Sequence, residues 1–171
     1  MFEPEAFVNY IENLVADYPD QINFAVDNFD DLLDGKFYTA LASGYNFRLI
    51  EPLFDNFQGE DAGSTTAATT GFYFSIRIPS LTTAAVRTAR KDTFDIAKRI
   101  IARLIFDSRK GHAFFGNLLN RFESANFKKD KQTFASGEGF QVGYLVTFQL
   151  RFDYIESVED LVADTNWRDL P

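Results

Sequence analysis

The chain has 171 residues, a length that suits one domain, and 46% of its residues are hydrophobic. It contains no Cys, which excludes disulfide and thiolate chemistry, and its formal net charge of −8 argues against nonspecific binding to nucleic acid. The acidic start "MFEPEAFVNY" lacks the basic and apolar regions of a signal peptide, and no apolar run approaches the ~20 residues that span a bilayer. We therefore expect a single soluble domain over residues 1–171, made in the cytoplasm.

Charge is distributed unevenly along the chain. Residues 1–61 hold 13 acidic and 2 basic residues, residues 62–110 hold 3 and 9, and residues 111–171 hold 9 and 6. This segregation predicts a polar molecule with one basic face. That face is either a solvated helix surface or a surface that meets an acidic surface on a neighbouring copy.

The first segment predicts a helix and a strand. Apolar residues recur at helical spacing over residues 4–17, where Pro4 suits a helix start and Pro19 ends the pattern. Alternation over residues 22–26 then predicts a short strand.

The next segment is more ambiguous. Residues 28–42 have apolar residues at helical spacing, but Gly35 weakens that assignment, so helix and strand both stay open. Residues 45–54 predict a strand that Pro52 stops. Residues 56–71 are rich in Gly, Ser, Thr and Ala and predict a flexible loop.

A second strand and a long basic helix follow. Residues 72–80, "FYFSIRIPS", alternate cleanly, and residues 82–109 have the apolar spacing of one long helix with Gly111 as its C-cap. Eight basic residues lie on this helix or just past its end: Arg87, Arg90, Lys91, Lys98, Arg99, Arg103, Arg109 and Lys110.

The last part of the chain predicts a short helix over residues 113–121, a strand over 122–127 and a loop over 128–139. Residues 140–154, "FQVGYLVTFQLRFDY", have an apolar side chain at every even position and predict one long strand. Residues 155–171 form an acidic tail that still holds apolar side chains, Trp167 among them.

Together these elements predict an α+β fold: a mostly antiparallel sheet with helices packed on one face and one unusually long C-terminal strand. The even-numbered residues of 72–78 and 140–152 should face the helices, and Ser75 and Thr147 should not be buried. Deep burial is predicted for Phe72, Phe74, Ile76, Val146, Phe148 and Leu150. The alternation favours a sheet whose second face is wetted.

Chemical motifs are weak. The one histidine, His112, has no Cys or second His with which to bind zinc, and "SGEGF" (136–140) lacks the Lys-Ser/Thr ending of a phosphate-binding loop. Asp27 and Asp31 have the spacing of calcium ligands, but the Gly and Glu that complete such a loop are missing. We predict no catalytic residues, no metal site and no cofactor, and therefore no enzyme.

The long strand is the most informative feature. Fifteen extended residues span about 50 Å, whereas a compact domain of this length has a radius of gyration near ~16 Å. Unless Gly143 bends it, the strand should project from its own domain and need partners, and identical copies in a ring are the simplest source.

The order of elements resembles the tail terminator and tail-completion proteins of tailed bacteriophages. The resemblance covers residues 4–154 and is carried by "GFYFSIRIPS", the long amphipathic helix after it and "GFQVGYLVTFQLRF". It implies a non-enzymatic virion protein, assembled in the host cytoplasm, whose identical subunits form a ring at the neck. The ring would terminate or complete the tail and join it to the head connector and other neck proteins. DNA would pass through its channel without sequence-specific binding, and no membrane would be involved.

Subunit contacts are expected from the far half of the strand 140–154, the loop 56–71 and the tail 155–171. The basic helix would either face acidic neighbours or line part of the DNA channel, and the sequence leaves both open. The predicted interface residues are Arg87, Lys98, Arg99, Arg103, Gln149, Arg151, Asp153 and Trp167. Two other functions stay open. One is a small apolar-ligand-binding domain that uses some of the 20 Phe residues, and the other is a non-viral adaptor that oligomerises.

Overall fold

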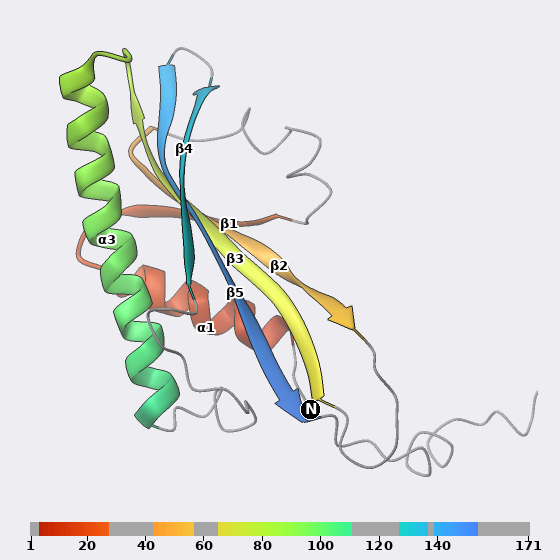
Figure 1. The fold of residues 1–171 in the computed structure, drawn as a ribbon. Helices are drawn as coiled ribbons and strands as arrows, with labels where there is room; N and C mark the ends of the chain where they lie inside the picture. The colour runs from red at the N-terminus through yellow and green to blue at the C-terminus, as the bar shows by residue number, and fades with distance from the viewer. Residues whose placement is uncertain (1–3, 28–42, 57–64, 111–126, 137–138, 154–171) are drawn as a thin grey trace, which may run out of the picture.

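A computed structural model describes residues 4–27, 43–56, 65–110, 127–136 and 139–153 (Figure 1). Several predictions from the sequence lie outside the described residues. They concern residues 28–42, His112, the helix over 113–121, the strand over 122–127 except its last residue, and the tail over 155–171.

The described residues form two helices and a five-stranded sheet, which confirms the α+β assignment. The strands are ordered β1-β2-β3-β5-β4 across the sheet, and every neighbouring pair is antiparallel except β1 and β2. The elements in chain order are α1 (Pro4–Ala16), β1 (Ile22–Asp27), β2 (Tyr45–Asn56), β3 (Thr65–Ile78), α3 (Thr83–Lys110), β4 (Lys128–Ser136) and β5 (Gly139–Asp153).

Both helices pack on the same face of the sheet, as predicted. The even-numbered residues of β3 and β5 join them in one apolar core, in which Phe7 of α1 contacts Phe148 of β5 edge to face. Ile76 is only half-buried, although the alternation predicted deep burial there. The fully buried large side chains of this face are Phe7, Ile11, Phe47, Leu49, Phe72, Phe74, Ile100, Leu104 and Leu150.

The opposite face of the sheet is not wetted at its centre, which corrects the prediction. Ser75 and Gln141 are both 0% exposed, and Ser75 Oγ donates to Gln141 Oε1 at 2.9 Å. Nearby, Arg48 of β2 forms a bidentate ion pair with the buried carboxylate of Asp27. The side chains still alternate in the predicted register, so the error lies in the expected solvent exposure and not in the pairing. A small polar residue such as Ser can be buried when its hydroxyl is hydrogen-bonded.

The long strand β5 does not project alone. It pairs with β3 from Phe140–Ile78 to Asp153–Thr65, so a strand of similar length from the same chain runs beside it. The predicted loop over residues 56–71 is wrong for residues 65–71, because these Thr and Ala residues extend β3 backwards along β5. The composition of this segment, rich in Gly, Ser, Thr and Ala, predicted a loop. β-branched Thr is nevertheless a good strand former, and here it pairs with β5.

Two further boundaries differ from the sequence-based expectation. Pro52 does not end β2; the strand continues to Asn56, and the register shifts between Ile50 and Leu53. A proline within a strand belongs at such an irregularity, where no ladder hydrogen bond is needed from its nitrogen. Residues 128–136, expected to be part of a loop, form the edge strand β4, whose lysines are typical of strands at the edge of a sheet.

Gly143 marks the closest approach of β3 and β5. A Cβ atom at this position would collide with the carbonyl oxygen of Phe74 and would lie 2.7 Å from Ser75 Cα. The glycine is therefore needed because two backbones meet, and not because the chain bends there.

We predict that Gly143→Ala lowers the free energy of unfolding by about 1–3 kcal/mol, the usual cost of overpacking a closely packed site. Urea denaturation would measure the change. Asp130→Ala, at an exposed position of β4, is the control and should stay within about 0.5 kcal/mol of the parent. Equal midpoints for the two variants would contradict the close approach.

We also predict that Ile100→Ala costs about 2–5 kcal/mol, because the side chain is 1% exposed and lies in the core between α3 and the sheet. Ile100→Asp should leave the domain unfolded, since it places an unpaired charge in an apolar site. Lys98→Ala, on the exposed side of the same helix, is the matched control. A cooperative unfolding transition for Ile100→Asp would overturn this packing assignment.

Candidate interaction surface on helix α3

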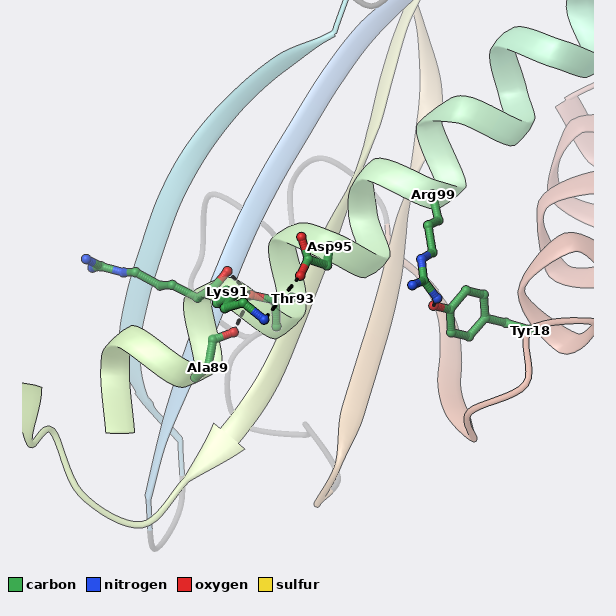
Figure 2. Close-up of polar contacts among 7 residues, drawn as sticks. Tyr18, Ala89, Lys91, Thr93, Asp95 and Arg99 are labelled. Atoms are coloured by element: carbon green, nitrogen blue, oxygen red, sulfur yellow. Dashed lines mark hydrogen bonds and ion pairs between the residues drawn. The ribbon is translucent and has the colours of Figure 1, made fainter. Parts of the chain in front are cut away.

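Helix α3 is amphipathic over its 28 residues. One face buries Ile96, Ile100 and Leu104 against the sheet, as the apolar spacing predicted. Thr93 is also buried, and its hydroxyl donates to the Ala89 carbonyl oxygen at 2.7 Å, so no polar atom of this side chain is left unsatisfied (Figure 2).

The opposite face of α3 presents cations. Arg87, Lys98, Arg99 and Arg103 are exposed, as predicted. Among the described residues the helix forms two ion pairs. Lys91 Nζ lies 3.7 Å from Asp95 Oδ2, and Arg103 Nε lies 2.9 Å from Asp107 Oδ2. The Lys91–Asp95 pair is exposed at both ends, so it contributes little to stability.

A first groove lies between α1 and α3 and has a volume of about 290 Å³. At its floor the buried carboxylate of Asp107 accepts hydrogen bonds from Tyr10 Oη at 2.7 Å and from Arg103 Nε. At its rim Arg99 Nη1 donates to Tyr18 Oη at 3.2 Å (Figure 2). We call this the α1–α3 groove.

Tyr10 serves this groove as a neutral hydrogen-bond donor. Burial raises the pKa of its hydroxyl well above the ordinary value of 10.0, and the neighbouring Asp107 raises it further. The phenol therefore stays protonated at neutral pH and cannot act as a base there. The Tyr10–Asp107–Arg103 contacts join the two helices, and they give no sign of a catalytic pair.

A second groove lies between the N-terminal half of α3 and strands β4 and β5, with a volume of about 480 Å³. We call it the basic groove. Cations from α3 and β4 line it together with the ring of Phe94, which is 39% exposed and lies 5.4 Å from the ring of Tyr144. The lining residues are Leu81, Thr83, Val86, Arg87, Arg90, Lys91, Phe94, Lys131 and Tyr144.

Arg90 is held at the wall of the basic groove. Its Nη2 donates to Thr133 Oγ1 of β4 at 3.3 Å, which ties the helix to the edge strand. Its Nε is buried and has no hydrogen-bond partner within the described part of the chain. The Arg90 guanidinium is therefore partly satisfied, through Nη2, while its buried Nε is left without a partner in the described residues, which is costly.

The predicted interface residues fall in different places. Arg87 lines the basic groove, Arg99 and Arg103 line the α1–α3 groove, and Lys98 is exposed on α3 and lines neither. Gln149 is exposed on β5, five residues beyond Tyr144 of the basic groove and, as an odd-numbered position, on the other face of the sheet. Arg151 and Asp153 belong to the backbone of β5, but their side chains, like Trp167, lie outside the description.

Sequence reasoning missed the aromatic and β4 members of the basic groove. The alternation predicts Tyr144 in the core, which is confirmed, since the side chain is 8% exposed; its second role as a lining residue of the groove was not predicted. Lys131 lies in a segment that was predicted to be a loop. The segment "KKDKQTFAS" has no alternation that would mark a strand, and only its lysines, which are typical of edge strands, point to β4.

Other classes of site find little support in the described residues. No group of three or more potential metal-ligating side chains occurs there. None of the described helices is long and apolar enough to cross a membrane.

We predict that in Tyr10→Phe the free energy of unfolding decreases less with rising alkaline pH than it does in the parent. A tyrosine whose folded-state pKa is raised contributes stability below its unfolded pKa of about 10 and loses it as the pH rises further, because only the unfolded chain ionises. Urea midpoints at pH 8 to 11 should therefore fall more steeply for the parent than for Tyr10→Phe. Parallel curves would show that the buried phenol does not retain its proton.

Comparisons with known proteins do not assign an identity. No family model matches the chain, and no curated protein matches its sequence.

Proposed function

We propose that this chain is a structural subunit that assembles with identical copies into the ring at the neck of a tailed bacteriophage. The ring terminates or completes the tail and joins it to the head connector, and DNA passes through its centre. This is the role that the resemblance of the sequence implies, and it places the protein in the virion and in contact with other neck or tail proteins.

The observation that carries this proposal is the exposed cationic face of α3 on a chain of net charge −8. The helix carries eight basic and three acidic residues. Two of its basic residues, Lys91 and Arg103, have carboxylate partners among the described residues. An acidic molecule with one cationic face is electrostatically complementary to other parts of its own copies.

The acidic net charge of the chain also favours a protein, and not DNA, as the partner of the cationic face of α3. Proteins that hold DNA through its phosphates are strongly positive overall, whereas this chain is acidic. In the proposed ring the cationic face therefore meets neighbouring subunits, and DNA passes through the channel without being gripped.

The main alternative, an apolar-ligand-binding domain, fits the described residues less well. The aromatic side chains of the core contact one another directly; for example, the rings of Phe47 and Phe72 stack at 4.6 Å. The two grooves described above are lined in large part by charged and polar side chains. Such grooves suit a charged partner better than a lipid.

We predict that the purified chain forms ring-shaped particles whose formation weakens as salt rises, because screening shortens the reach of surface charges to about 8–10 Å near physiological ionic strength. Light scattering after size-exclusion chromatography would give the mass, and negative-stain microscopy the shape. Labelled antibody against the chain should then mark the necks of phage particles.

The matched variants test the same surface. Lys98→Glu combined with Arg99→Glu should weaken assembly, and the neutral pair Lys98→Gln and Arg99→Gln should have a smaller effect. A chain that stays monomeric at high concentration, is absent from virions and retains a small apolar molecule would contradict the proposal in favour of ligand binding.

A further inference from the structure

We infer that the basic groove between α3 and β4 binds the acidic segment 155–171 of a neighbouring copy, so that subunits join head to tail. The inference deepens the proposed function, since it names the contact that would build the assembly. The inference rests on the proposed function only in expecting a closed ring. Head-to-tail contacts between subunits can also produce an open filament.

The chemistry of the groove calls for an acidic and partly apolar partner. Arg87 on α3 and Lys131 on β4 are exposed on its two walls, and no carboxylate in the described ranges pairs with either. Between them, Phe94 and Leu81 expose 39% and 48% of their surface. An anionic segment that also carries apolar side chains would satisfy both features.

Segment 155–171, "IESVEDLVADTNWRDLP", has this composition. It carries five acidic residues and one basic residue. Its acidic residues are interspersed with large apolar ones, so one segment supplies carboxylates for the cations and apolar side chains for the rings. The apolar residues are Ile155, Val158, Leu161, Val162, Trp167 and Leu170.

The direction of β5 favours a neighbouring copy over the same chain. Tyr144 lines the groove, and β5 runs from there to Asp153 at the opposite end of the sheet (Figure 1). Nine strand residues at ~3.3 Å each separate these points by about 30 Å. Segment 155–171 would have to reverse and use about nine of its own residues to return to its own groove. The groove of a copy placed beyond Asp153 needs no reversal.

Charge reversal and mixing test this contact in the full chain. One variant reverses two charges of the groove, Arg87→Glu with Lys131→Glu. Another reverses two charges of the segment, Asp160→Lys with Asp164→Lys, which changes its net charge from −4 to 0. Each alone should raise the concentration for half-assembly about tenfold, as two attractive pairs become repulsive. An equimolar mixture should recover to within about threefold of the parent. When the two variants alternate in the assembly, the unchanged groove meets the unchanged segment, and the reversed groove positions meet the reversed segment positions.

The controls separate folding from assembly. Circular dichroism should be unchanged in every variant, and Glu5→Lys with Glu12→Lys, at exposed positions of α1 outside the groove, should assemble nearly as the parent does. If a groove variant does not fold, Arg87→Gln with Lys131→Gln replaces it, and the concentration for half-assembly should still rise.

The outcomes distinguish this inference from the proposed function. The groove contact is overturned if neither reversal weakens the assembly of the chain, or if the mixture of the two variants does not recover. Either result leaves the ring proposal standing. Recovery in the mixture with open filaments in place of rings supports the contact and overturns the ring. A parent that is monomeric at every concentration overturns both.

Discussion

The antiparallel ladder between β3 and β5 is the interaction on which the rest of the structure depends. It runs over 14 residue pairs, from Ile78–Phe140 to Thr65–Asp153, and it occupies the middle of the sheet. Its even-numbered residues supply the apolar surface that both helices cover. Because side chains alternate between faces, a slip of one residue would expose that entire surface, so the core and the register specify each other. Gly143 is part of the same constraint, since it allows the two backbones to meet.

The second face of the sheet shows how that register is reinforced. Buried polar side chains there are paired across strands: Asp27 with Arg48, and Ser75 with Gln141. Gln141 Nε2 has no hydrogen-bond partner among the described residues, which is an unusual cost. A buried ion pair adds little net stability, but removing one partner is expensive. Such pairs favour the one alignment of β1, β2, β3 and β5 that satisfies them, at a position where apolar contacts alone would tolerate others.

Much of the fold could be predicted because periodicity is a local signal. The α1 and α3 stripes and the alternation of β5 follow from side chains that are close in sequence. Strand β4 and residues 65–71 could not be predicted in this way. Their Lys, Thr and Ala residues carry no apolar alternation, and only pairing with β5 makes them strands. The burial of Ser75 likewise depends on distant parts of the chain. For the interaction surface, the exposed cations of α3 were foreseen, but the groove was not, since Lys131 and Phe94 meet only after β4 pairs with β5.

The cations of α3 are not explained by folding. Arg103 has a structural role, because it helps Tyr10 to satisfy the buried Asp107. By contrast, Arg87 and Lys98 are exposed and contact no carboxylate in the described ranges. Surface charges of this kind add about 0–1 kcal/mol each to stability at most, and like charges along one helix repel each other. A helix could be buried equally well with neutral polar residues at these positions. The concentration of charge on this face is therefore better explained by association than by the stability of the single chain, and an acidic partner is what would relieve its repulsion.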